Sequence, residues 1–258
     1  LAMAKVKDLP VLVNFTGSDW CGWCKIMDRD VFSKEDWGKF ASSQLVMAHI
    51  DFPRNQELVP AEYKERNDKL QERFKVEGYP TFVLLDSDGQ TELGRLSAGQ
   101  GKSPGSFAME VRQVLRQRPS EIAKVAKALG EPQAKAYREA LATSQEKDRL
   151  LRQWLATEPV ENEANTAKFA ELNGAIEKAK AAVEQFNLTY ARKLLTPEQS
   201  KTYEANKASL AKAVAELQTW LQTRPTQTPE NMEKFKAFQQ NIAQLQDKIG
   251  SLEGQFGI

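Results

Sequence analysis

The chain has 258 residues, of which 41% are hydrophobic, and this length and composition predict one or two domains with ordinary apolar cores. Its 36 basic and 35 acidic residues give a formal net charge of +1, so charge provides no general attraction to nucleic acid or to an anionic membrane. No apolar run approaches the roughly 20 residues that span a bilayer. We therefore expect no nucleic-acid partner and no membrane span.

The first elements lead to a pair of cysteines. Leu1 to Asp8 is expected to form the end of a helix, and without an initiator methionine or a signal peptide we expect a mature or trimmed form. The β-branched run from Val11 to Phe15 predicts a buried strand, and helix-compatible spacing follows from Cys24 to Val31. Cys21 is therefore expected at the N-terminus of a helix.

Cys21 and Cys24 are the only cysteines in the chain. Two thiols separated by two residues on the first turn of a helix close a small disulfide ring and reopen it by exchange. The helix dipole and free N–H groups favour a thiolate at Cys21, which predicts that Cys21 attacks and that the better shielded Cys24 resolves. A zinc site is the alternative, but two cysteines and the lone His49 fall short of four ligands, so we expect no metal and no cofactor.

Further along, short segments follow in an order that resembles the thioredoxin superfamily. In that superfamily a strand of the type VLVxF precedes WC-x-x-CK, and a cis-proline loop and a glycine loop come later. This chain offers the runs Trp20 to Lys25, Gly78 to Thr81 and Leu93 to Gln100, with an Asp86–Gly89 hairpin turn between the last two. The resemblance covers residues 1–118 and implies an α/β thioredoxin-like domain, a central mixed sheet flanked by helices.

The resemblance also implies the remaining elements and a substrate groove. It places a second parallel strand at Leu45–Asp51 and helices at Glu62–Phe74 and Ser106–Arg116. It implies that the cis-proline loop packs against the dithiol and binds extended substrate backbone. The implied groove residues are Trp20, Gly22, Trp23, Tyr79, Pro80 and Gly94. For the tryptophans and the tyrosine the alternative is ordinary core packing, and for Trp23 we favour the groove.

Two departures from the family pattern bear on the chemistry. Asn14 stands where many members carry a buried acid that assists proton transfer to the inner thiol, and an amide cannot be that base. Trp23 precedes the second cysteine, where proline or histidine is common, so the tetrapeptide leaves the reduction potential and the direction of electron flow open. The combination FTGSDWCGWCK with a later Asp51–Arg54 segment resembles a branch of bacterial thioredoxin-like proteins, many of them exported.

Beyond Arg118 the composition changes to strong helix formers, which predicts an all-helical domain over residues 119–258. Identities recur at an offset of 66 residues, such as Trp154-Leu155 with Trp220-Leu221, and indicate a duplication over about 119–184 and 185–250. Each copy is expected to be one helical hairpin with a break at proline. Expected helices cover about 132–155, 162–190, 197–221 and 230 onwards.

Long apolar stripes on the return helices predict coiled-coil-like seams. In the first hairpin Ser144 and Asp148 interrupt the seam of the outgoing helix, where the copy has leucine and valine. We expect Asp148 to turn outward to solvent. A polar contact that specifies register or a partner surface is the alternative.

The sequence thus predicts a thiol-disulfide oxidoreductase, a reductase or isomerase of protein disulfides. The alternative is a partner-binding or chaperone-like scaffold in which the helical domain is the functional part. Expected partners are client proteins with disulfides and a thiol protein that donates or accepts electrons, with a homodimer through the helical domain as a further possibility. The resemblance implies the bacterial cell envelope or periplasm, with the cytoplasm as the alternative.

Overall fold

The computed structural model describes residues 1–256, which group by contact into two compact units. One unit contains residues 1–118 and 205–256, and the other contains residues 119–204. Both this grouping and the division predicted from the sequence have a boundary after Arg118. The division into domains 1–118 and 119–258 stays a prediction. Gly257 and Ile258, the last two residues of the predicted helical domain, lie outside the described residues.

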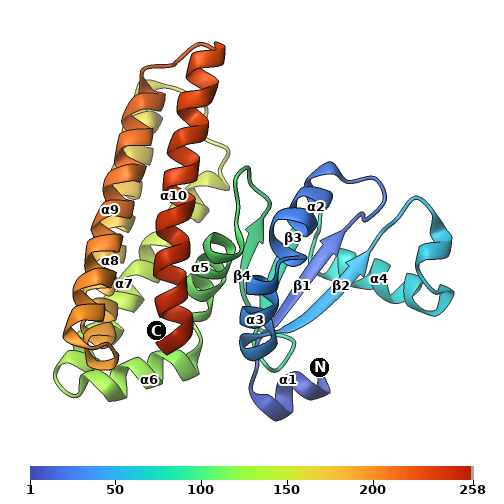
Figure 1. Ribbon diagram of the computed structural model, residues 1–258, viewed down its shortest axis with the longest axis horizontal. Coiled ribbons are helices and arrows are strands. Elements are labelled where there is room, and N and C mark those ends of the chain that lie inside the picture. The colour runs from blue at the N-terminus through green and yellow to red at the C-terminus, as the bar shows by residue number, and fades with distance from the viewer. Residues whose placement is uncertain (257–258) are drawn as a thin grey trace. The chain divides into compact units, whose positions relative to one another are not determined.

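The first 118 residues contain a four-stranded mixed sheet (Figure 1). Its strands are β1 (Val11–Thr16), β2 (Val46–Asp51), β3 (Thr81–Leu85) and β4 (Glu92–Ser97). Their spatial order is β2-β1-β3-β4; β1 and β2 are parallel, and β3 runs antiparallel to both β1 and β4. The predicted α/β class with a central mixed sheet is confirmed, and β2 is the predicted second parallel strand.

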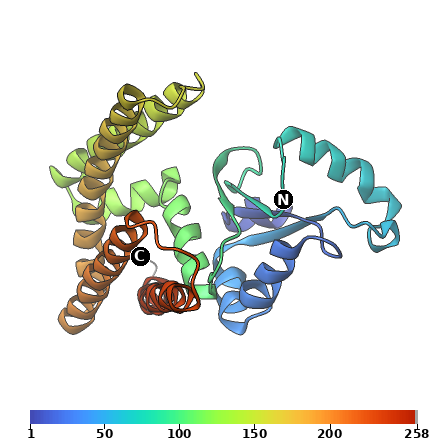
Figure 2. The ribbon, with the colours of Figure 1, turned by 90° about the horizontal axis from the view of Figure 1, so that it is seen from above.

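Helices cover both faces of the sheet because successive strand side chains point to opposite sides. Leu12, Phe82 and Leu84 enter one apolar cluster, and Val13 and Val83 enter the other. Facing the first cluster are α2 (Gly22–Met27), a π-helical turn (Asp28–Phe32), α3 (Glu35–Gln44) and α5 (Pro104–Leu115), and facing the second are α1 (Ala2–Lys7) and α4 (Ala61–Arg73). Figure 2 shows α4 and α3 on opposite sides of the sheet.

A buried arginine closes the end of this α/β part. Arg118 donates from Nε to Asp86 at 2.9 Å and from a terminal nitrogen to Asp8 at 2.8 Å, and its side chain is only 7% exposed. Asp8 follows α1 and Asp86 begins the turn between β3 and β4, so one guanidinium joins three segments that are distant in sequence.

The rest of the described chain is helical, as predicted. Its helices are α6 (Pro119–Leu129), α7 (Gln133–Leu155), α8 (Glu163–Leu194), α9 (Pro197–Gln222) and α10 (Pro229–Phe256), with a short 3-10 helix (Gln56–Leu58) before α4 in the α/β part. In the unit of residues 119–204, α6, α7 and α8 pack around an apolar cluster that contains Leu129, Tyr137 and Tyr190.

The hairpins α7–α8 and α9–α10 end in the same contacts. In each, a tryptophan ring lies against a phenylalanine ring, with centroids 6.5 Å apart in the first hairpin and 6.3 Å in the second, and a lysine lies over the tryptophan. These groups are Trp154, Phe169 and Lys168 in the first, and Trp220, Phe235 and Lys234 in the second. The shared contacts support the proposed duplication.

Asp148 lies near a lysine of the facing helix. Its carboxylate lies 3.9 Å from the ammonium of Lys180 on α8, and the two side chains are 35% and 46% exposed. Asp148 is thus partly exposed to solvent and also lies near a cation of the facing helix, so the structure does not decide between the two expectations.

Candidate active site

The two cysteines lie where β1 ends and α2 begins. Cys21 is the N-cap of α2 and has an extended backbone, whereas Cys24 lies within its first turn. The two form a disulfide with a Cα–Cα distance of 5.2 Å, inside the range of about 4.4–6.8 Å that a disulfide spans. Both residues are buried in this oxidised form, at 5% and 6% exposure, so burial does not distinguish an attacking cysteine from a resolving one.

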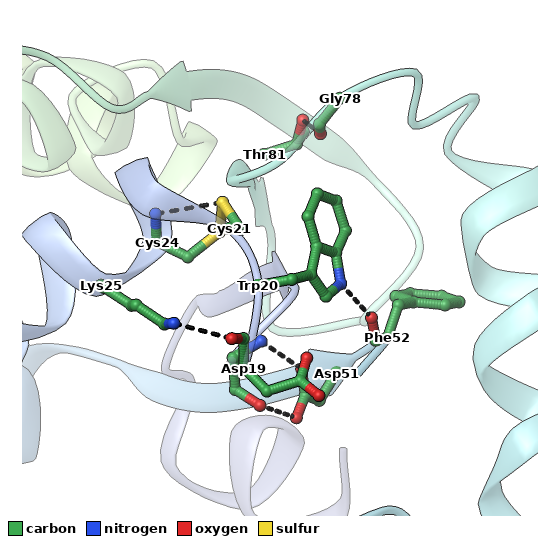
Figure 3. The surroundings of a disulfide bond; sticks show 10 residues. Asp19, Trp20, Cys21, Cys24, Lys25, Asp51, Phe52, Gly78 and Thr81 are labelled. Carbon is green, nitrogen blue, oxygen red and sulfur yellow. Dashed lines mark hydrogen bonds between the residues drawn. A yellow bond between two sulfur atoms is a disulfide. The ribbon is translucent and has the colours of Figure 1, made fainter. Parts of the chain in front are cut away.

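The backbone of α2 distinguishes them instead. The N–H of Cys24 donates to Sγ of Cys21 at 3.1 Å, the bond by which an N-cap side chain satisfies a free N–H group of a helix (Figure 3). In the reduced protein the same donor and the positive end of the helix stabilise negative charge on Cys21. The geometry thus favours a thiolate at Cys21.

Two aspartates hold the loop before the dithiol. Asp51, at the end of β2, accepts bonds from the backbone N–H and the hydroxyl of Ser18 at 2.9 and 2.6 Å. The carboxylate of Asp19 accepts from the N–H groups of Asn55 and Arg54, and these two bonds lower its pKa below the ordinary value. The two loops that border the dithiol are therefore joined by charge-assisted hydrogen bonds.

The backbone of Asp19 also contacts the dithiol helix. Its carbonyl accepts from Nζ of Lys25 at 2.7 Å, so the Asp19 carboxylate and the Lys25 ammonium do not pair with each other (Figure 3). The sequence did not indicate a role for Ser18. Its partner Asp51 was noted only as the first residue of the Asp51–Arg54 segment. That segment suggested a family branch without revealing which loop it binds.

Aromatic side chains border the dithiol. Trp20 is 38% exposed and donates from its indole N–H to the carbonyl of Phe52 at 2.8 Å (Figure 3). Its ring meets the ring of Tyr79 edge to face, with centroids 5.6 Å apart. Trp23, between the cysteines, is 47% exposed, which agrees with the groove position favoured for it over the core.

The proline loop lies beside the same helix start. The peptide bond between Tyr79 and Pro80 is cis, and the hydroxyl of Thr81 donates to the carbonyl of Gly78 at 2.7 Å. The hydroxyl of Tyr79 accepts from the Gln71 side chain at 2.7 Å, and burial raises the pKa of this phenol above its usual value. Figure 3 shows Gly78 and Thr81 on the side of Cys21 away from Asp19 and Asp51.

The two predicted groove glycines have different surroundings. Gly22 is exposed, and a methyl group on it would meet no atom within 4 Å. Gly94 pairs with Leu84 in the middle of β4, and a methyl group there would lie 2.9 Å from a side-chain methyl of Val114 on α5. Gly94 therefore lies in close contact with α5, and its place in the substrate groove stays a prediction.

Asn14, which stands where many family members have a buried acid, is polar but not acidic. Asn14 is 4% exposed and lies opposite the exposed His49 in the parallel pair of β1 and β2, with Nδ2 3.3 Å from Nδ1 of the histidine. Its Oδ1 is buried and has no hydrogen-bond partner among the described residues. A buried carbonyl oxygen in this position is an acceptor that cannot take up a proton as a carboxylate would.

Residues 1–256 contain neither a candidate membrane span nor a candidate metal site. None of the helices there combines the length and the apolar character needed to cross a bilayer. Within the same residues, no three or more His, Cys, Asp or Glu side chains are grouped as they would be around a metal ion.

Comparisons with known proteins concern the first half of the chain. The family model "Thioredoxin-like domain" matches residues 1–114. The disulfide bond reductase DsbH of Chlamydia pneumoniae is 34% identical over 114 residues, 44% of this chain and 65% of DsbH. The thioredoxin-related protein DsbJ of the same organism is 26% identical over 38% of this chain and 28% of DsbJ.

A third relative and a solved structure match similar lengths. The thiol:disulfide interchange protein DsbD 2 of Pseudomonas aeruginosa is 28% identical over 42% of this chain and 17% of its own length. A solved DsbH oxidoreductase is 31% identical, with 45% of this chain and 79% of that chain covered and a TM-score of 0.42. The chain spans about two thirds or less of the length of the curated relatives it matches.

Proposed function

Residues 1–114 are a thioredoxin-like domain of the thioredoxin superfamily, and we propose that the protein is a thiol-disulfide oxidoreductase that reduces disulfides of client proteins. The observation that carries the proposal is the Cys21–Cys24 disulfide at the start of α2, with the Cys24 N–H directed at the Cys21 sulfur. A redox-inactive scaffold would not need this arrangement. The relative named as a disulfide bond reductase, which is 34% identical, supports the reductive direction.

In the first step the Cys21 thiolate attacks one sulfur of a client disulfide. A bond forms between Cys21 and that sulfur while the client S–S bond breaks, and its electron pair leaves with the second client sulfur as a thiolate that takes a proton from water. The N-cap position suits Cys21 to this role because the thiolate is the nucleophile and the helix start stabilises it.

In the second step the thiolate of Cys24 attacks the Cys21 sulfur of the mixed disulfide. The Cys21–Cys24 bond forms, the bond to the client breaks with its electron pair on the client sulfur, and the client leaves as a thiolate that takes its second proton from water. The client has then gained two electrons and two protons, and the dithiol has lost the same number. When another thiolate of the client instead attacks the client sulfur of the mixed disulfide, a new client disulfide forms, Cys21 leaves as a thiolate, and the client is isomerised with no net redox change.

Residue 14 is an asparagine and not an acid, so water or another group must accept the proton of the Cys24 thiol. Asn14 accepts but does not take up a proton, so it orients the thiol at most. The proposed reductase therefore differs from family members with a buried acid in how fast Cys24 becomes a thiolate.

The partners follow from the electron count. Each turnover leaves the dithiol oxidised, so a thiol protein must reduce it again, and client proteins with disulfides are the electron acceptors. We propose a bacterial envelope or periplasmic location, as for the exported branch that the sequence resembles. A homodimer through the helical part stays a prediction.

The test compares two single-cysteine variants with wild type in the reduction of insulin. Cys24→Ala is expected to accumulate a covalent complex with the insulin chains, visible on a non-reducing gel, because the second step is blocked. Cys21→Ala is expected to form no such complex, and both variants lose turnover. The Cys21 role is wrong if the complex forms through Cys24 in the Cys21→Ala variant.

The same experiment separates the enzyme from a scaffold. If both variants reduce insulin as fast as wild type, the dithiol is secondary. That result would favour the partner-binding alternative. Titration of the dithiol against a glutathione redox buffer then decides the direction, because a strongly negative reduction potential is typical of a reductant and a less negative one of an oxidant.

A further inference from the structure

A groove of about 1110 Å³ lies in the unit formed by residues 1–118 and 205–256, between the loop that follows β4 and the tip of the α9–α10 hairpin. Small-molecule sites usually measure about 300–1,000 Å³. This groove is therefore large enough for several side chains of a longer ligand.

The lining combines apolar walls with neutral amides. Trp220, Leu221, Met232 and Phe235 form the apolar surface, and Leu221 and Met232 are 46% and 63% exposed. Gln100 and other amide side chains complete the lining, together with one glutamate and one lysine, whose charges cancel. Amides both donate and accept hydrogen bonds, as peptide groups do. Such a surface suits an uncharged polypeptide segment and offers no cluster of cations for a phosphate.

The hairpin is attached to the domain that contains the dithiol. Within the same unit α10 packs on α5, where Arg112 donates to the carbonyl of Gly250 at 2.9 Å and Arg116 pairs with the buried Glu253 at 2.9 Å (Figure 1). Gly101, which has a positive φ of 74°, passes close to the side chain of a glutamine on α10. One wall of the groove is thereby fixed to the loop that follows β4.

The sheet register places this loop at the dithiol edge. Thr81, the first residue of β3 and the neighbour of Pro80, lies opposite Ser97, the last residue of β4. β1 also ends at this edge, because Phe15 lies opposite Thr81, and its continuation leads to Cys21. The loop that begins at Ser97 therefore starts beside the proline loop, and its residues Gln100 and Gly101 line the groove.

We propose that this groove binds an apolar, extended segment of the client polypeptide whose disulfide the dithiol reduces. The inference rests on the proposed function and adds a substrate class, namely unfolded or locally open polypeptides with exposed apolar residues near a disulfide. The neutral, amide-rich lining and the start of the lining loop at the dithiol edge favour this occupant over a small anion. The groove contributes affinity that a small disulfide does not use.

The internal duplication supplies a matched control. Leu221 in the second hairpin and Leu155 at the corresponding place in the first are 46% and 45% exposed, and only Leu221 lines this groove. The experiment measures kcat/KM for insulin and for oxidised glutathione in wild type, Leu221→Asp and Leu155→Asp. Its readout is the ratio of the two values, because a change that affects only the dithiol alters both substrates alike.

Leu221→Asp is expected to lower the ratio of insulin to glutathione about tenfold, a loss equivalent to about 1.4 kcal/mol of transition-state binding. Leu155→Asp is expected to leave the ratio within about twofold of wild type. An equal ratio in all three proteins contradicts the role of the groove in client binding and leaves the proposed function unaffected. Failure of wild type to exchange with either substrate overturns the proposed function itself.

A binding measurement covers the case in which Leu221→Asp does not fold. The probe is fluorescein-labelled insulin B chain with its cysteines carboxymethylated, followed by anisotropy, and the second variant is Met232→Asp at the more exposed position. Met232→Asp is expected to weaken binding at least threefold, and unchanged binding contradicts the proposal. Light scattering checks the other occupant: a dimer of wild type that Met232→Asp converts to monomer assigns the groove to a second copy of the chain and overturns the client assignment.

Discussion

The packing of α10 on α5 depends on a glycine. Gly105 lies in the first turn of α5, and a methyl group built on its Cα would lie 2.7 Å from the Cα of Asp247 on α10 and would also overlap the Asp247 carboxylate. Real methyl groups do not approach a backbone carbon so closely, and a backbone atom cannot rotate away as a side chain can. Gly105→Ala must therefore move one helix relative to the other.

The sign of the effect makes the test informative. Glycine inside a helix is less favourable than alanine by about 0.5–1 kcal/mol, so Gly→Ala without a clash increases stability. Insertion of a methyl group into a closely packed contact costs about 1–3 kcal/mol. Gly105→Ala is therefore expected to lower the free energy of unfolding. Gly38→Ala in α3, where a methyl group meets no atom within 4 Å, is expected to raise it.

Thermal unfolding of wild type and the two variants provides the measurement. For a chain of this size 1 kcal/mol corresponds to about 2–4 °C in Tm. Gly105→Ala is thus expected to lower Tm by about 2–8 °C and Gly38→Ala to raise it by about 1–4 °C. An increase in Tm for Gly105→Ala similar to that for Gly38→Ala would refute the close approach of the two helices, and with it the fixed wall of the groove.

Two further predictions concern the dithiol loop and the β3–β4 turn. Trp20→Phe removes the hydrogen bond from the indole to the carbonyl of Phe52 and is expected to cost about 1 kcal/mol by urea unfolding, whereas Trp23→Phe costs clearly less; equal losses contradict the role of the bond. Hydrogen bonds from Thr91 lower the pKa of Asp88 to about 2, so its contribution to stability is complete above its ordinary pKa of 3.8 and is lost as the pH falls toward 2. Between pH 4 and pH 2 the wild-type urea midpoint is expected to fall more than that of Asp88→Asn, and parallel curves would show that the turn does not hold a carboxylate.

The parts of the site that the sequence predicted are local in the chain. The strand before the cysteines, the start of α2 at Cys21 and the hairpin turn each depend on neighbouring residues, so spacing and residue type were sufficient. Trp23, placed in the groove, is exposed in the structure. The helix α3 was not predicted, because family resemblance offered no motif there and its apolar positions alone gave a weak signal.

The contacts that the sequence did not predict join residues far apart in the chain. Motif order placed Gly94 near the groove, and its close contact with Val114 of α5 was not predicted. The bonds from Ser18 to Asp51 join loops 33 residues apart, and the bond from Arg112 to α10 joins residues 138 apart. No spacing rule in one sequence selects such partners, because any exposed carboxylate or carbonyl is a candidate until the fold brings one of them close.

The two hairpins share their tip contacts but differ in the residues around them, and this difference bears on the proposed binding role of the second hairpin. Both copies keep the tryptophan, phenylalanine and lysine that hold the tip together. At the surrounding positions they differ, with Glu163 and Thr166 in the first copy and Pro229 and Met232 in the second. The second tip has thus exchanged a charge and a hydroxyl for apolar groups, and both of those groups line the groove. Because both tips keep the contact between tryptophan and phenylalanine, that contact does not require the exchange, and contact with an apolar ligand beside the dithiol domain gives the exchange a physical reason.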